Sequence, residues 1–188
     1  MMIDKHVVKM PTETCQMLHT NALYFQYVQV NDKEPTLAEL KAFHKENGSL
    51  MMKPAMLNHP STIWARQSKE NFHWLYMHGY ELCKEFSFRY GKEHGSFQRI
   101  VDTEMPINWQ DSWKFPTAGL TPISIAMDDR YRLPKEKHCW DFVIRSCQHY
   151  YLRGKWDFAF WSKRKEPDWW PENHRYNMIK NRKPFGGI

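Results

Sequence analysis

The first polar residues that could share a chemical task are His6, Lys9, Glu13 and Gln16, which follow one another at steps of three, four and three residues. In a helix this spacing places them on one face. An imidazole, a cation and a carboxylate on one face can bind a phosphate group and transfer protons beside it. A solvent-facing amphipathic helix has the same pattern, because its apolar residues occupy the other sides. The segment is therefore either part of a site or an ordinary polar surface.

A second feature is the basic and aromatic composition of residues 149–188. This stretch holds nine Lys and Arg against four Asp and Glu, so it carries five of the six net positive charges of the chain. It also holds ten aromatic residues. Lysine and arginine neutralise phosphates and aromatic rings stack on bases, so this composition is typical of nucleic-acid binding. The alternative is that the rings form a core and the cations face solvent.

The residues around these features predict a mainly helical fold. Pro11 removes one backbone donor from the first helix, so a kink or a late start near Met10 is expected. A capping box at residues 36–39 opens a short helix, and Gly91 ends a longer one. The expected helices lie at residues 4–24, at 36–46, from 58 onward, at 68–90, at 140–151 and at 156–164.

The connections between these helices predict how the chain is organised. Residues 101–137 contain four prolines and no sustained period, so we expect a long Pro-rich loop that wraps the domain. Residues 31–49 are expected to be an insertion, and residues 171–188 a loosely held tail. With 188 residues, the chain is long enough for one sizeable core and is expected to be a single compact domain.

The composition argues against several classes of protein. No run of about 18 apolar residues is present, so no membrane span is expected, and the first residues have no apolar signal-peptide core. The four cysteines are scattered without a CxxC pair, which favours reduced thiols and argues against zinc. There is no Gly-rich nucleotide loop. We therefore expect a cytoplasmic protein without a metal or cofactor.

Three short segments together resemble a known family. They are Asp4-Lys5-His6 with Glu13 nine residues after Asp4, Asn-His-Pro-Ser-Thr-Ile-Trp-Ala-Arg at 58–66, and His-Tyr-Tyr-Leu-Arg-Gly-Lys at 149–155. In these segments the chain is similar to the pyrimidine-dimer DNA glycosylase/AP lyase family, the endonuclease V of T-even phages, and most similar to a phage and bacterial branch linked to it. The resemblance implies a compact helical fold that grips double-stranded DNA, kinks it and flips out a nucleotide. A phage-encoded protein would act in the host cytoplasm.

The resemblance also implies roles for single residues. Glu13 falls where the family places its catalytic carboxylate, which stabilises a developing sugar cation and moves protons as the glycosidic bond breaks. His6 is the second catalytic candidate. The implied enzyme flips out a pyrimidine or modified base and cleaves its glycosidic bond, in DNA repair or DNA modification. The DNA-binding candidates are Lys9, Arg66, Arg89, Lys92, Tyr150, Tyr151, Arg153 and Lys155.

One departure from the family concerns its lyase step. The family uses its N-terminal amine as the nucleophile, and only residues 1–3 precede Asp4 here. Nine helical steps of about 1.5 Å separate Asp4 from Glu13 by roughly 14 Å. We therefore expect little lyase activity through that amine.

Two other functions fit the same residues. A transferase that decorates a hydroxymethylated pyrimidine would also flip its base, and it would need a pocket for a small-molecule donor. A non-catalytic DNA-binding protein would use Glu13 only to pair with Lys9. Structural roles compete as well: opening a helix for His59, pairing with Glu85 for Arg89, core packing for Trp64, Trp74 and Trp161, and plain solvent exposure for residues 163–165.

Overall fold

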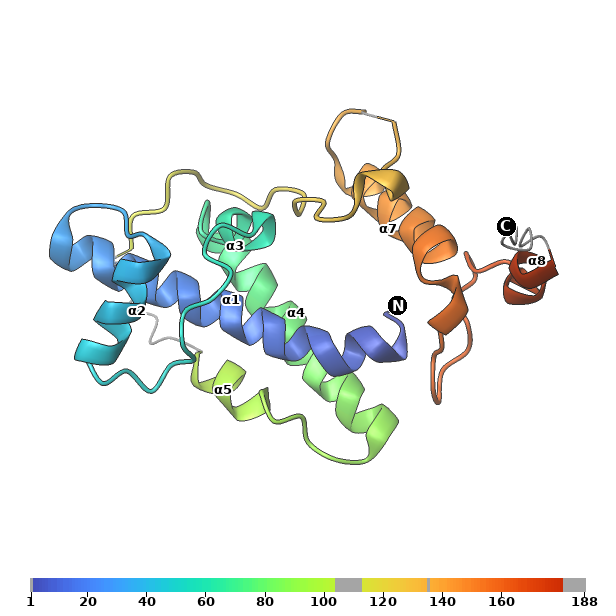
Figure 1. Ribbon diagram of the computed structural model, residues 1–188, viewed down its shortest axis with the longest axis horizontal. Coiled ribbons are helices and arrows are strands. Elements are labelled where there is room, and N and C mark those ends of the chain that lie inside the picture. The colour runs from blue at the N-terminus through green and yellow to red at the C-terminus, as the bar shows by residue number, and fades with distance from the viewer. Residues whose placement is uncertain (1, 104–112, 135, 181–188) are drawn as a thin grey trace, which may run out of the picture. The chain divides into compact units, whose positions relative to one another are not determined.

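The computed structural model describes residues 2–103, 113–134 and 136–180, which are mainly helical and include no strand. The chain divides into two compact units. Unit 1 combines Met1–His6 with Met127–Ile188, and unit 2 is Val7–Ala126. Figure 1 shows the elements of both, coloured along the chain. The expectation of a single compact domain stays a prediction.

The longest helix, α1, runs over Asp4–Asn31. Val7 and Leu18 on this helix are fully buried, as expected for the apolar side of an amphipathic helix. The predicted late start is wrong, because the helix is continuous through Pro11. Pro11 is itself buried, so packing around it stabilises a turn that lacks one backbone donor. The helix also extends past its predicted end at residue 24, because Phe25 and Tyr27 are buried there.

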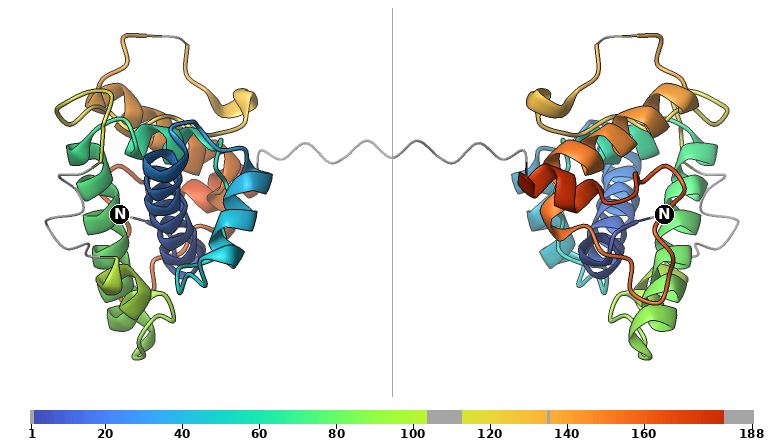
Figure 2. Two further views of the ribbon diagram at one scale, coloured as in Figure 1. Left: turned by 90° about the vertical axis from the view of Figure 1, so that its left-hand side faces the viewer. Right: turned by 90° about the vertical axis from the view of Figure 1, so that its right-hand side faces the viewer.

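Helix α2, Leu37–Glu46, begins at the predicted capping box. The Thr36 hydroxyl accepts a hydrogen bond from the Glu39 amide, and the Glu39 carboxylate accepts one from the Thr36 amide. The Tyr27 and Phe43 rings meet edge to face with centroids 5.4 Å apart. These contacts hold α2 against the second half of α1, and both views in Figure 2 show the two helices as neighbours.

Helix α3, Pro60–Ala65, begins after the predicted opening residue His59, and helix α4 runs over Lys69–Tyr90. The His59 side chain accepts a hydrogen bond from a backbone amide of the first turn of α3, so this histidine has the helix-opening role. Ser68 caps α4. Gly91 ends it in the left-handed conformation at φ 69°, which glycine adopts without steric cost.

Helices α1 and α4 cross at close range in unit 2. A Cβ atom at Gly79 would lie 2.7 Å from Cγ2 of Thr14 and 3.2 Å from Cδ1 of Ile100. The lack of a side chain at residue 79 therefore lets the two helices approach. Around the crossing lies an apolar core in which Trp113 stacks on Phe25 at a centroid separation of 4.4 Å. Figure 2 shows α1 between α2 on one side and α4 on the other.

Two imidazoles of unit 2 pack within the fold, His19 buried and His78 partly buried. His19 accepts the Met52 amide at Nδ1, so its Nε2–H donates to the Thr103 hydroxyl, and both bonds measure 2.7 Å. Burial lowers the pKa of His19 below its ordinary value of 6.5. His78 stacks on Trp74 with ring centroids 5.1 Å apart, and burial lowers its pKa to about 4. Both side chains are therefore neutral parts of the fold near pH 7.

The predicted Pro-rich loop is described only in part. Its first residues belong to α5, Phe97–Asp102, and residues 104–112 lie outside the described residues. Trp113 is buried. Asn71 of α4 fixes a later part of the segment, because its side chain donates to the Thr121 hydroxyl and accepts the Thr121 amide, both at 2.9 Å.

Unit 1 is built on α7, Trp140–Gly154. Two short 3-10 turns flank this helix, η1 at Asp129–Tyr131 and η2 at Trp156–Phe158. The predicted helix over 156–164 is wrong beyond Phe158, where the chain continues without helical structure. The described part of the predicted tail forms α8, His174–Lys180, and residues 181–188 lie outside the described residues.

The core of unit 1 is a small aromatic cluster. Ile3, from the start of the chain, is fully buried and belongs to the same cluster as Tyr151, Trp156, Trp161 and Trp170. The rings of Trp161 and Trp170 meet edge to face at a centroid distance of 5.0 Å. The N-terminal segment is therefore an integral part of a core that the C-terminal sequence builds.

The composition predicted reduced cysteines and no membrane-spanning segment. All four cysteines are free thiols, as predicted. Burial raises the pKa of Cys15 to about 12 and that of Cys83 to about 11, so neither is a reactive thiolate near pH 7. Within the part of the chain that the structure describes, no helix combines the length and the apolar character needed to cross a bilayer.

Candidate functional site

The polar face of α1 is the first part of the candidate site. Nζ of Lys9 lies 2.7 Å from Oε1 of Glu13, one turn further along the helix. The Lys9 side chain is 67% exposed and the Glu13 side chain 28%, so this pair contributes only about 0.3–0.5 kcal/mol to stability. Solvent therefore reaches the Lys9 ammonium group that pairs with the Glu13 carboxylate. A phosphate could compete with Glu13 for this cation.

His6, at the start of α1, belongs to unit 1 and bonds there to Tyr151. Its Nδ1 lies 2.7 Å from the Tyr151 hydroxyl, and the two rings lie with centroids 5.3 Å apart. Tyr151 is only 9% exposed, so its ring packs in the core instead of facing solvent, where a base could stack on it. The hydroxyl orients the imidazole, because the bond at one ring nitrogen sets the direction of the other.

Asp4 fixes the first turn of α1 within unit 1. Its carboxylate accepts the Ser162 amide at 2.9 Å and the Ser162 hydroxyl at 2.6 Å. The Asp4 amide donates to the Phe160 carbonyl at 2.8 Å. Hydrogen bonds to a charged acceptor are strong, so the neighbouring Lys5 and His6 have defined positions.

Two lysines converge on one aromatic ring in unit 1. Nζ of Lys5 lies 4.1 Å from the centroid of the Phe158 ring, and Nζ of Lys155 lies 5.4 Å from the same centroid. Lys155 also lies 4.8 Å from the Tyr150 ring. Two ammonium groups beside one ring repel each other and together attract an anion. Lys5 is not among the predicted DNA-binding residues. In the sequence, only its place in the Asp-Lys-His segment pointed to a role.

The Tyr150 ring lies close to the backbone at the end of α7. A Cβ atom at Gly154 would lie 2.8 Å from Cε2 of Tyr150 and 3.0 Å from Cζ of Tyr131. The two tyrosine rings lie with centroids 5.2 Å apart. Glycine at residue 154 thus gives room for the half-buried Tyr150 ring beside Lys155, while Arg153 is exposed.

Six cations of unit 1 differ in whether they have an ion-pair partner. After residue 149, the described residues offer no ion-pair partner to Arg153, Lys155 or Lys165, although the same stretch contains four acids. Isolated cations of this kind keep their charge available to a ligand. The earlier arginines are paired instead: Arg130 with Asp128, Arg132 with Asp129, and Arg145 with Glu136 and Asp141.

Two of the predicted phosphate contacts in unit 2 have structural roles. Nη1 of Arg66 donates to a backbone carbonyl at 2.8 Å, and the guanidinium lies 4.5 Å from the Tyr24 ring centroid. Arg89 is 3% exposed and pairs with Glu85 at 2.7 Å, which is the structural alternative for this residue. Guanidinium groups held in this way do not support the predicted phosphate clamp. Lys92 is exposed just after α4.

The predicted residues thus meet in separate groups. His6 bonds Tyr151 and Tyr150 lies beside Lys155 in unit 1, while Lys9 pairs with Glu13 in unit 2. Among the described residues, no three His, Cys, Asp or Glu side chains gather where they could hold a metal ion. Comparison with protein-family models, with curated proteins and with solved structures found no match to this chain.

Proposed function

We propose that the protein binds double-stranded DNA through the unit 1 cation surface, defined here as Lys5, Tyr150, Arg153, Lys155 and Phe158. The observation that carries this proposal is the convergence of Lys5 and Lys155 on the Phe158 ring. Two phosphates of a DNA backbone that passes this ring would neutralise the two ammonium groups and release counterions from the DNA. The neighbouring rings offer apolar faces to sugars and bases.

The finer proposal is that the bound DNA is a substrate. In a pyrimidine-dimer-glycosylase-like fold, the protein would flip out a pyrimidine or modified base, and Glu13 would stabilise the sugar cation as the glycosidic bond breaks. His6 is the second candidate for proton transfer. The support for this step is the resemblance in three short segments and the partial exposure of Glu13.

A second function, DNA binding without catalysis, is favoured by one observation. Glu13 pairs with Lys9 at 2.7 Å. An exposed pair one helical turn apart is common on protein surfaces and needs no catalytic explanation.

DNA binding is tested with the double variant Lys5→Gln/Lys155→Gln. Each phosphate contact that is lost lowers the slope of log affinity against log salt by about 0.9, so the slope should fall by about 2 and the affinity by roughly tenfold or more. The matched control is Arg130→Gln/Arg132→Gln, which removes the same charge from the same unit but from side chains already paired with acids. Equal losses in both variants, or binding that does not change with salt, would contradict the proposal.

Catalysis is tested with Glu13→Gln on DNA containing damaged or modified pyrimidines, with base release measured by mass spectrometry. The variant should retain DNA affinity and lose turnover, because the carboxylate acts in the transition state. Glu81→Gln is the control, since Glu81 is also an exposed α-helical acid paired with a lysine. DNA binding by the wild-type protein without any base release would leave the non-catalytic function standing.

A further inference from the structure

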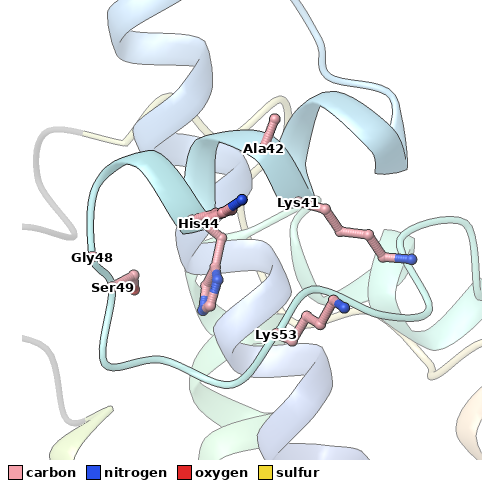
Figure 3. A pocket seen from close by; sticks show the side chains of 7 residues that line it. Lys41, Ala42, His44, Gly48, Ser49 and Lys53 are labelled. Atoms are coloured by element: carbon pink, nitrogen blue, oxygen red, sulfur yellow. The ribbon is translucent and has the colours of Figure 1, made fainter.

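Three lysines of unit 2 line one hollow of about 670 Å³. Lys41 and Lys45 come from α2, and Lys53 comes from the segment that follows it. Figure 3 shows Lys41 and Lys53 on facing walls, with the His44 ring pointing from the helix toward the opposite segment. The remaining lining residues are Ala42, His44, Gly48 and Ser49, so no acidic side chain lines this hollow.

Local bonds build the second wall of the hollow. Gly48 adopts a left-handed conformation at φ 56°, which reverses the chain at the end of α2. Nε2–H of His44 donates to the Met51 carbonyl at 2.9 Å, since a carbonyl only accepts. The Ser49 hydroxyl oxygen accepts the Met51 amide at 3.2 Å. The segment that carries Lys53 is therefore fastened to the helix that carries Lys41 and Lys45.

Interaction with the carboxyl end of α2 does not explain the positions of all three lysines. Cations near the carboxyl end of a helix offset the partial negative charge of its last carbonyl groups. Here the amides of residues 47–49 already bond to those carbonyls. Lys41 lies in the middle of α2 and Lys53 lies outside it, so only Lys45 has this explanation. All three lysines are exposed, and none has an ion-pair partner among the residues that the structure describes.

We propose that this hollow, the α2 lysine hollow, binds a phosphate-bearing anion. Three like charges without an acid repel one another, and an anion with two or more charges relieves that repulsion. Because Ser49 accepts the Met51 amide with its oxygen, its hydroxyl hydrogen remains a possible donor to the anion. The phosphate chain of a nucleotide and adjacent backbone phosphates of a nucleic acid share this chemistry. The proposal does not rest on DNA binding by unit 1.

The test compares two triple variants with the wild-type protein. Lys41→Gln/Lys45→Gln/Lys53→Gln removes the charges of the hollow, and Lys33→Gln/Lys84→Gln/Lys114→Gln removes three charges elsewhere in unit 2. Inorganic tripolyphosphate and a short duplex DNA are titrated separately by calorimetry at low salt. The hollow variant should lose about tenfold or more in affinity for at least one probe, because each exposed charge contributes a few-fold. The control variant should change affinity by less than about twofold, and replacing the three hollow lysines with arginine should preserve binding.

The two probes distinguish the two sources of phosphate. Loss of tripolyphosphate binding with unchanged DNA affinity identifies a free oligophosphate as the ligand. Loss of DNA affinity with a smaller salt slope identifies a nucleic-acid backbone. The proposal is overturned if the wild-type protein binds neither probe saturably, or if the hollow variant and the control variant lose the same affinity. The Lys5→Gln/Lys155→Gln variant reports on unit 1 separately, so failure of one proposal does not imply failure of the other.

Discussion

The two units use their cations in different ways. In unit 2, Arg66 bonds a backbone carbonyl and Arg89 is buried against Glu85, so both guanidinium groups belong to the fold. In unit 1, Lys5 and Lys155 lie against Phe158, and the described residues give them no carboxylate partner. A cation over a ring keeps most of its field available to a ligand, whereas a buried and paired cation does not. Local partners therefore say more about binding than the number of charges in a segment.

The cores of the units differ as well. Unit 2 is held by a helix crossing that leaves no space for a side chain at Gly79. Unit 1 is held by indole and phenol rings gathered around Ile3. Two rigid helices that cross closely cannot easily move apart to fit a larger side chain. An aromatic ring at the edge of a small cluster can rotate to make room. This contrast predicts that the two units respond unequally to similar substitutions.

The largest effect is expected for Gly79→Ala. The new Cβ atom would lie 2.7 Å from Cγ2 of Thr14 and 3.2 Å from Cδ1 of Ile100, so we expect unit 2 to lose about 2–3 kcal/mol of unfolding free energy. Gly154→Ala in unit 1 is the comparison. Its Cβ meets the ring edge of Tyr150, which can turn aside, so a loss of about 1 kcal/mol or less is expected.

Urea unfolding followed by circular dichroism and tryptophan fluorescence measures both variants. Equal losses would contradict the contrast between the cores. The same curves test the prediction of a single domain, because one domain gives coincident transitions by both probes and independently folding units give separate ones.

The next effect is a loss of stability in acid that is specific to unit 2. Burial lowers the pKa of His19 and brings that of His78 to about 4, so the folded state binds fewer protons than the unfolded chain. The stability of unit 2 is therefore full above about pH 6.5 and falls as the pH decreases toward 4, by about 2 kcal/mol for His78 after allowance for its partial exposure. His78→Gln should flatten this dependence in urea midpoints measured at pH 7 and pH 4.5. An unchanged pH dependence in the variant would show that His78 is not the titrating group.

The smallest effect is expected for Tyr151→Phe in unit 1. The substitution removes the hydroxyl that bonds Nδ1 of His6 and leaves the packed ring in place, so a loss of about 1 kcal/mol is expected. A double-mutant cycle with His6→Ala measures the coupling between the two side chains. A coupling free energy near zero would mean that the bond does not stabilise unit 1.

Helix ends could be predicted where the signal lies within a few residues. The capping box at Thr36 and Glu39 and the helix end at Gly91 each act over one turn, and each is confirmed. The extra length of α1 depends on the burial of Tyr27 against Phe43, which is a tertiary contact. The late start predicted from Pro11 was wrong because tertiary packing around this buried proline outweighs the loss of one backbone hydrogen-bond donor.

The candidate site was less predictable than the helices. Helical spacing correctly paired Lys9 with Glu13, because the two are one turn apart. The bond between His6 and Tyr151 joins residues 145 positions apart, and no periodic pattern records such a contact. The lysines of the α2 hollow were missed because Lys53 reaches the hollow only through the turn at Gly48.

The placement of Ile3 and His6 in unit 1 has a consequence for the order of folding. During synthesis, residues 7–126 emerge as one continuous stretch, so unit 2 has its whole sequence before unit 1 does. The first residues of the chain must wait for partners such as Ser162, which lies 158 positions after Asp4. Contacts between such distant positions form late, because a long loop has to close first. The segments synthesised after unit 2 therefore complete a core whose first side chain was made before unit 2.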